Sequence, residues 1–65
     1  MEKLAELQVR DKVKLILSRG EYKGSERIDL RQYFLKDDEY IATKRGISFD
    51  SEYLDDFLDM VETLR

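Results

Sequence analysis

Aromatic and cationic side chains are interleaved along one stretch of the chain, EYKGSERIDLRQYF, which spans residues 21–34. A basic pair follows within KRGISF, at residues 44–49. Single-stranded nucleic acids are bound by cations that follow the phosphate backbone and by aromatic rings on which bases stack. Both residue types occur here at a spacing that suits an unpaired strand, and the candidate contacts are Tyr22, Lys23, Arg31, Phe34, Lys44 and Arg45.

Each of these residues also has an ordinary structural role to fill. Tyr33 and Phe34 are neighbours, so on a regular strand their side chains point to opposite faces, and at least one is expected in the core. Arg31 could pair with Asp29 or Glu26, and the later basic pair could be solvated charge. From residue types alone, these structural roles are favoured over nucleic-acid contacts.

Charge is unevenly distributed along the sequence, whose formal net charge is −3. Residues 9–47 contain ten Lys and Arg against seven Asp and Glu, a balance of +3, whereas residues 48–65 contain one against six, a balance of −5. Residues 1–8 contribute the remaining −1. Overall acidity argues against a nucleic-acid partner, but the distribution gives the middle of the chain a locally positive field.

Catalytic chemistry is disfavoured by the composition, because the chain contains neither histidine nor cysteine. The usual general base, the thiol nucleophile and the two commonest ligands of transition metals are therefore missing. The carboxylate pairs at residues 37–38 and 55–56 are expected to be exposed charge, since the first lies in a solvated run of charged residues and helix neighbours one apart, as in the second, do not face each other. We predict a protein that is not an enzyme and that needs no metal and no cofactor.

The small size of the chain favours association with a second copy. A domain of 65 residues can bury only about 60% of its unfolded surface. Without a disulfide or a structural zinc, oligomerisation is the remaining way to stabilise such a core. The lack of cysteine fits a reducing compartment, and no apolar run is long enough for a signal peptide or a membrane span. We expect one domain, residues 1–65, in a cytoplasmic protein that is nucleoid-associated if it is bacterial.

Two stretches have the alternation of a half-buried strand. They are residues 13–18, VKLILS, and residues 27–34, RIDLRQYF. Two glycines with polar neighbours lie between them, which predicts an antiparallel hairpin with its loop at residues 21–26.

Further strands are predicted on either side of this hairpin. A polar connector at residues 36–39 precedes an extended run over residues 40–49 that contains Gly46. A glycine inside a strand indicates a bulge or the close approach of another chain. Residues 6–9 predict a short first strand, with a short N-terminal helix as the alternative.

The last segment, residues 50–65, has the period of an amphipathic helix. Its apolar side chains recur at steps of three and four residues, and they are Leu54, Phe57, Leu58, Val61 and Leu64. Asp50 or Ser51 is the predicted N-cap. Tyr53 and Met60 widen the stripe beyond the needs of one sheet face, so part of it is expected to meet a second subunit. The predicted dimer interface comprises Phe57, Met60, Val61 and Leu64.

Strands first and one helix last give an α+β fold.

Taken together, these blocks resemble the single-stranded-DNA-binding domain of the transcriptional positive cofactor four family. The family pattern is an aromatic followed by Lys-Gly, an Ile-Asp-Ile-Arg strand ending in two aromatics, a variable turn, a basic pair with Gly-Ile-Ser, and a closing helix. Here EYKGSERIDLRQYF, KRGISF and the last segment match that pattern in order, and the resemblance covers residues 13–64.

The resemblance implies a four-stranded, strongly curved antiparallel sheet backed by one C-terminal helix (ββββα). It also implies a homodimer whose two sheets form adjoining channels for unpaired strands. The implied function is largely sequence-independent binding of single-stranded DNA in transcription regulation or in DNA replication and repair. By position, the implied nucleic-acid contacts are Tyr22, Lys23, Arg31, Phe34, Lys44 and Arg45, joined by Lys14 on the preceding strand.

The chain departs from the family pattern at a few positions. Ser25 replaces a frequent lysine, Phe34 stands where tryptophan is common, and Ala42 and Thr43 replace a usual Pro-Gly. The serine-rich regulatory tail of eukaryotic members is absent, as expected for a free-standing bacterial or viral type. A dimeric protein-interaction module of the same fold, without nucleic-acid binding, is the alternative function, and the choice between DNA and RNA stays open.

Overall fold

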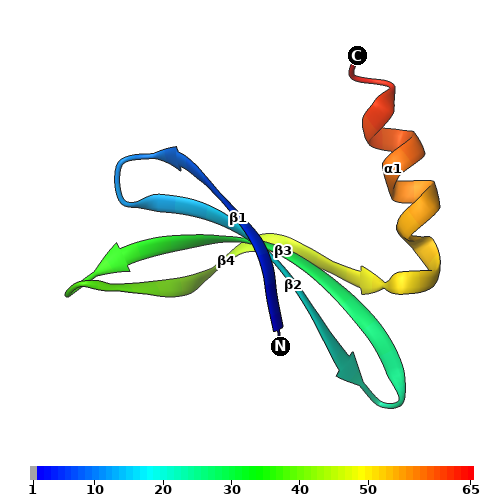
Figure 1. Ribbon diagram of the computed structural model, residues 1–65, viewed down its shortest axis with the longest axis horizontal. Helices are drawn as coiled ribbons and strands as arrows, with labels where there is room; N and C mark the ends of the chain where they lie inside the picture. The colour runs from blue at the N-terminus through cyan, green and yellow to red at the C-terminus, as the bar shows by residue number, and fades with distance from the viewer. Residues whose placement is uncertain (1) are drawn as a thin grey trace.

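The computed structural model describes residues 2–65 and has the order ββββα (Figure 1). The elements are β1 Glu2–Arg10, β2 Val13–Tyr22, β3 Ser25–Lys36, β4 Glu39–Asp50, a 3₁₀ turn Ser51–Tyr53 and α1 Leu54–Glu62. The strands pair antiparallel in the order β1-β2-β3-β4. The predicted α+β class and the four-stranded sheet are confirmed. The predicted first strand at residues 6–9 is also confirmed, and it is longer than the sequence pattern indicated.

Tight turns connect the strands. Lys23 and Gly24 both have positive φ, at 53° and 81°, as do Asp37 and Asp38, at 50° and 65°. Two-residue turns of this kind match the twist of antiparallel strands. The loops expected over residues 21–26 and 36–39 therefore shrink to two residues each, and the strands on both sides extend into them.

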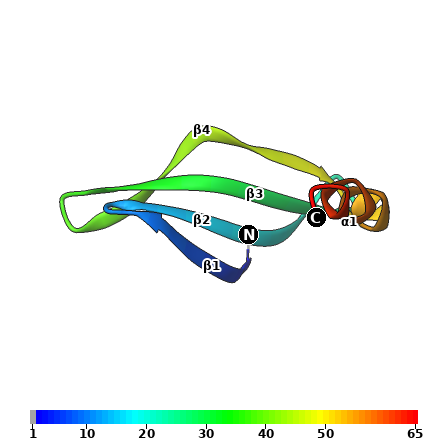
Figure 2. The same cartoon turned by 90° about the horizontal axis from the view of Figure 1, so that it is seen from above.

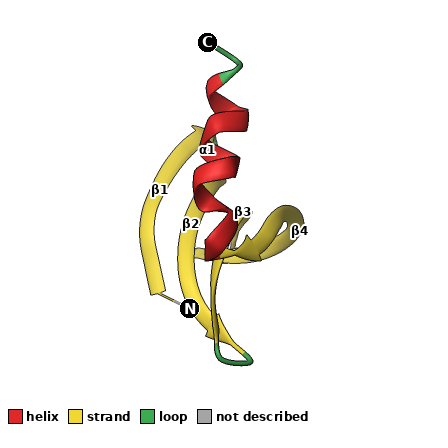
Figure 3. Cartoon of the chain, turned by 90° about the vertical axis from the view of Figure 1, so that its right-hand side faces the viewer, coloured by secondary structure: helices red, strands yellow, loops and turns green. Residues whose placement is uncertain are grey.

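The sheet is long, thin and curved, with its turns at two ends (Figures 1 and 3). The β1–β2 and β3–β4 turns lie at one end, whereas the β2–β3 turn and the start of α1 lie at the other. The molecule measures 36 × 34 × 18 Å, and its radius of gyration is 13.0 Å. A compact domain of this length would have a radius of gyration of about 11 Å. Among residues 2–65, the buried apolar side chains are Val13, Ile16 and Ile28, so one protomer has little core.

A bulge of three residues interrupts β4 where it pairs with β3. Arg31 lies opposite Gly46 and Tyr33 opposite Ala42, so three residues of β4, Thr43 to Arg45, face the single residue Gln32. Gly46 ends this bulge with its backbone pressed against β3. A Cβ at Gly46 would lie 2.7 Å from the Leu30 carbonyl oxygen and 2.8 Å from the Arg31 Cα. The glycine inside the strand pattern therefore marks a bulge, as predicted, and the backbone that comes close to it is β3 of the same chain.

Replacing Gly46 with alanine should destabilise the fold. The added methyl group would meet backbone atoms, which cannot turn aside as a side chain can, so β3 and β4 must separate. Overpacking of this kind costs about 1–3 kcal/mol. Urea unfolding should show the loss as a lower midpoint, while Lys44→Ala, on an exposed part of the same strand, should leave the midpoint nearly unchanged. An unchanged midpoint for Gly46→Ala would contradict the close approach.

The helix differs from its predicted form in where it begins and where it lies. Residues Ser51–Tyr53 form a 3₁₀ turn, so the α-helix begins at Leu54 rather than beside Asp50. Asp50 does precede that turn, but within the described chain its side chain accepts no capping hydrogen bond.

The helix stands at the end of the sheet where β4 ends, instead of backing the sheet as the resemblance implied (Figure 2). Phe57 contacts Phe49 with ring centroids 5.0 Å apart, and every residue of α1 is at least partly exposed. Across residues 2–65, no helix is long and apolar enough to cross a membrane.

Candidate nucleic-acid interface

An open groove of about 380 Å³ lies at the end of the sheet that carries the β1–β2 and β3–β4 turns. We call it the Phe34 groove, and its lining residues are Arg10, Asp11, Val13, Gln32, Phe34, Thr43 and Arg45. The Phe34 side chain is 48% exposed. The groove thus combines an accessible aromatic ring with two guanidinium-bearing residues, which is the combination that holds a base and its phosphates.

Sequence reasoning did not single out Arg10, which the strand register brings into this groove. Arg10 is opposite Val13, and Val13 is opposite Phe34. Residues that face each other across antiparallel strands lie on the same face of the sheet. Arg10 and Phe34 are therefore two strands apart in one row. A basic residue just before a tight turn was the available signal, but its use required knowledge of the pairing of β1 with β2.

The bulge in β4 carries the basic pair out of the regular ladder. Lys44 and Arg45 are both exposed. The Thr43 hydroxyl donates to the Gln32 carbonyl oxygen at 2.7 Å, and its Oγ1 accepts the Arg45 amide hydrogen at 3.1 Å. Bulged residues are left unpaired by the ladder, so the basic pair is presented to solvent beside the groove.

A second exposed aromatic lies at the β2–β3 turn. Tyr22 is 62% exposed, and the Lys23 Nζ lies 5.4 Å from the centroid of its ring. A cation this close to an aromatic face is attracted to the ring. The ring and the cation therefore form one small contact surface, which we call the Tyr22 turn. The two residues are also neighbours in the sequence.

The structure separates Tyr22 from Phe34 within one protomer. Phe34 lies opposite Val13, and Tyr22 follows Val13 by nine residues along β2, which is about 30 Å of strand. Nine is an odd number, and side chains alternate between the two faces. Tyr22 therefore shares a face with Lys14 and Arg31, whereas Phe34 lies on the other face. The predicted contacts form two surfaces rather than one.

Lys14 is half-buried and already has two partners. Its Nζ lies 3.3 Å from Glu6 Oε1 and 4.3 Å from the centroid of the Tyr40 ring. Hydrogen bonds from Lys3 and Lys14 lower the pKa of the Glu6 carboxyl, and the charges of both lysines add to the effect. Lys14 is thus held between β1 and β4, less accessible than the basic pair of the bulge.

Arg31 is also occupied within the fold. Its Nε and Nη2 donate to the two carboxylate oxygens of Asp29 at 3.2 and 2.9 Å, and its Nη1 donates to the Thr43 carbonyl oxygen at 2.9 Å. Asp29 is buried. The hydrogen bond and the charge of Asp29 raise the pKa of Arg31. Arg31 therefore uses three of its five N–H groups to join β3 to the bulge of β4.

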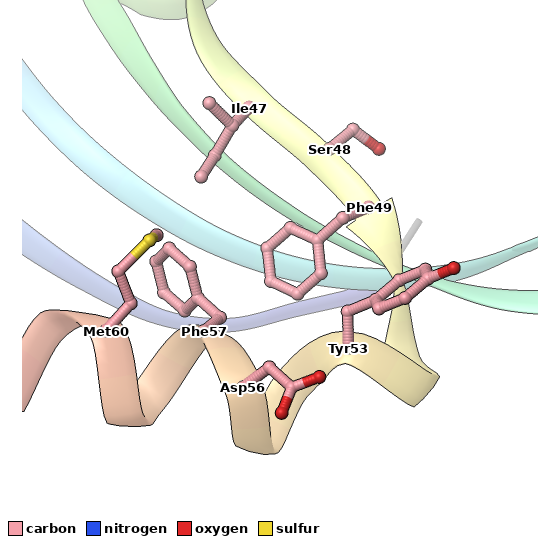
Figure 4. Close-up of a pocket in the computed structure, with 7 residues that line it drawn as sticks. All are labelled: Ile47, Ser48, Phe49, Tyr53, Asp56, Phe57 and Met60. Atoms are coloured by element: carbon pink, nitrogen blue, oxygen red, sulfur yellow. The ribbon is translucent and has the colours of Figure 1, made fainter.

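The predicted dimer residues line or extend an apolar hollow between α1 and β4 (Figure 4). This hollow has a volume of about 340 Å³, and its lining residues are Ile47, Ser48, Phe49, Tyr53, Asp56, Phe57 and Met60. Phe57 packs against Phe49 inside the protomer, while Met60 is 63% exposed. Val61 and Leu64 continue the stripe beyond the hollow, and Leu64 is 84% exposed.

Within residues 2–65, no group of three or more His, Cys, Asp or Glu side chains is placed so that it could hold a metal ion.

The sequence matches the model of a known protein family. The model of the family described as Transcriptional Coactivator p15 (PC4) matches residues 11–60. A search of curated protein sequences finds no match.

Two crystal forms of a PC4 homologue from Burkholderia pseudomallei share the fold. The orthorhombic form has a TM-score of 0.89 at 22% identity, covering 97% of this chain and 86% of that chain. The tetragonal form has a TM-score of 0.86 at 23% identity, covering 98% and 97%. A bacteriophage T5 protein, described as a homologue of the eukaryotic coactivator PC4 implicated in recombination-dependent DNA replication, has a TM-score of 0.77 at 20% identity, covering 98% and 77%. Because the family model matches well over half of the residues, the chain belongs to the PC4 family of transcriptional coactivators.

Proposed function

We propose that this protein is a homodimer that binds single-stranded DNA with little sequence preference, in transcription or in DNA replication and repair. The observation that carries this proposal is the Phe34 groove, where an exposed aromatic ring lies beside Arg10 and Arg45. An unpaired base has a free face for the ring, and its neighbouring phosphates suit the guanidinium groups. The T5 homologue, which is described as implicated in DNA replication, supports the process.

The proposed contacts divide by accessibility. Phe34 and Tyr22 stack on bases, and the exposed cations Lys23, Lys44 and Arg45 contact phosphates together with Arg10. Lys14 and Arg31 are paired within the fold, so we assign them a smaller share of phosphate binding. Both residues are cationic types that add to the positive field of the sheet.

Dimerisation is supported by the surface that one protomer leaves open. The chain exposes 5444 Å², whereas a compact monomer of 7.8 kDa would expose roughly 4400 Å². The excess of roughly 1000 Å² is about what one partner contributes to a stable interface. It includes large apolar side chains on β1, on α1 and just past the end of α1, among them Leu4, Leu7, Met60 and Leu64.

Two apolar depressions give that surface a shape to match. One is the hollow between α1 and β4 (Figure 4). The other, of about 150 Å³, is lined by Ala5, Glu6, Leu7, Leu15, Leu17 and Leu30 on β1, β2 and β3. A second copy can fill both, because a two-fold interface pairs one set of surfaces with the same set on the partner.

Light scattering at micromolar concentration should report a mass close to twice 7.8 kDa. The reason is that burial of the open apolar surface stabilises the pair. A mass of one chain across the micromolar range would contradict the dimer. The measurement needs no nucleic acid, so it tests the assembly separately from the function.

A fluorescence polarisation titration tests binding. Labelled oligo(dT) at low salt should bind more tightly than a duplex of the same length, because duplex bases are stacked on one another and cannot reach Phe34. A mixed-sequence single strand should bind within a few-fold of oligo(dT). Oligo(rU) in the same series decides between DNA and RNA. Equal affinity for duplex and single strand would reduce the groove to a general cationic patch.

The second candidate is a dimeric protein-interaction module without nucleic-acid binding. The acidity of α1 favours it, since Asp55, Asp56, Asp59 and Glu62 place four carboxylates on nine residues. The same titration separates the two, because this candidate requires that neither single-stranded nor duplex nucleic acid binds at low salt.

A further inference from the structure

The three-residue bulge of β4 is held in one conformation by hydrogen bonds from side chains rather than by the backbone hydrogen bonds of the sheet. With three residues facing one, the backbone groups of Thr43 to Arg45 lose their regular partners on β3. Thr43 supplies two replacements. Its hydroxyl donates to the Gln32 carbonyl oxygen at 2.7 Å, and the same oxygen accepts the Arg45 amide at 3.1 Å. The Thr43 hydroxyl thus bonds the start of the bulge to β3 and ties the Arg45 end of the bulge to Thr43.

Arg31 holds the bulge from the other strand. Its Nη1 donates to the Thr43 carbonyl oxygen at 2.9 Å. Its Nε and Nη2 are fixed by the buried carboxylate of Asp29. A guanidinium held in two directions by a carboxylate cannot follow a mobile strand, so the Thr43 carbonyl is bound to a rigid donor.

The residue that this arrangement fixes is Arg45. Its backbone is tied through its own amide to Thr43, and both residues line the groove beside Phe34. Lys44, between them, is exposed. An exposed arginine on a mobile loop loses conformational freedom when it binds a phosphate, whereas one whose backbone is already ordered loses less.

We propose that Thr43 is a positioning residue, supported by Arg31, that holds Arg45 ready to bind a phosphate beside the Phe34 ring. This inference rests on the proposed binding of single strands. It gives Arg31 a role that lysine could not fill, because an ammonium group cannot bind Asp29 in two places and donate to Thr43 in a third direction.

The first measurement uses the free protein and no nucleic acid. Thr43→Val keeps the shape of the side chain and removes the hydroxyl, while Thr43→Ser keeps the hydroxyl. Hydrogen exchange followed by NMR should show the Arg45 amide exchanging about tenfold faster in Thr43→Val and close to the wild-type rate in Thr43→Ser. Arg31→Lys should also accelerate it. Unchanged exchange in Thr43→Val would overturn the proposal. If valine prevents folding, Thr43→Ala provides the same test.

The second measurement is binding of oligo(dT) at several salt concentrations. Thr43→Val should bind about 2- to 10-fold more weakly, and the slope of log affinity against log salt should become shallower by up to ~0.7 as the Arg45 contact is lost. Thr43→Ser should restore both values. In an Arg45→Ala background, Thr43→Val should cause no further loss, because the two changes act through one contact. Independent, additive losses would show that Thr43 affects binding by another route.

The two measurements separate the failure of each proposal. If the wild-type protein binds no single strand, the proposed function fails, and with it the role of Arg45 toward phosphate. The exchange of the Arg45 amide would then report only on the bulge. If the wild type binds and Thr43→Val binds equally well with the same salt slope, the function stands and the positioning role is wrong.

Discussion

Replacing Leu64 with glutamate should convert the proposed homodimer into a folded monomer. Leu64 is 84% exposed and lies past the end of α1, so its side chain contributes little to the fold of one protomer. In a two-fold dimer the change occurs twice. Loss of two buried leucines at about 2 kcal/mol each weakens association by about 4 kcal/mol, or roughly 1000-fold. The buried charge adds to this loss.

Sedimentation velocity over a range of concentrations, with circular dichroism of the same samples, would measure both properties. Thr63→Glu is the matched control, since it introduces the same charge one residue earlier. It also removes the hydrogen bond that the Thr63 hydroxyl donates to the Met60 carbonyl oxygen at 2.7 Å, which is local to the end of the helix. It should remain dimeric. Phe57→Glu should behave differently from Leu64→Glu, because Phe57 packs against Phe49 inside the protomer, and we expect it to unfold the chain. A dimer that survives Leu64→Glu would exclude this end of the helix from the interface.

Replacing Phe34 with alanine should weaken binding of single-stranded DNA with almost no change in its salt dependence. A base stacked on an aromatic ring contributes ~1–3 kcal/mol, so the affinity should fall roughly 5- to 150-fold. The ring carries no charge, and the number of counterions released should therefore stay the same. Phe34→Trp is the matched control, because a larger ring keeps the stack, and it should bind at least as tightly as the wild type.

Arg45→Ala should change the salt dependence of binding, which Phe34→Ala leaves intact. It should weaken binding to all sequences alike and make the slope of log affinity against log salt shallower by ~0.7 for the phosphate contact that is lost. The two variants together distinguish a stacking surface from a cationic patch. If Phe34→Ala binds as tightly as the wild type, the Phe34 groove is not where bases stack.

Local patterns in the sequence were sufficient to predict the type and order of the strands and the helix. The alternation in residues 13–18 and 27–34, the polar residues between strands and the apolar stripe after Asp50 each act over a few neighbouring residues, and each appears in the structure as a strand, a turn or the helix. Gly46 carried information about a bulge because a missing Cβ matters only where another backbone comes close. The block order was specific enough to indicate the family, which the family model confirms.

Strand register decides which residues come together in the candidate site, and local sequence patterns do not reveal that register. Arg10 reaches Phe34 only because Arg10 pairs with Val13 and Val13 with Phe34. A shift of one residue would have put it on the opposite face. The same register separates Tyr22 from Phe34, although the sequence places both in one stretch of fourteen residues.

Tertiary contacts also decided which cations are accessible. Lys14, Arg31 and Arg45 are all cationic residues in the sequence, but Glu6 and Tyr40 contact Lys14, and Asp29 and Thr43 contact Arg31. Arg45 is left exposed on a bulge. The sequence by itself determined the type and order of the elements and the family pattern. Only the structure decided which residues meet, because pairing between strands distant in sequence sets both the faces of the sheet and the partners of each charge.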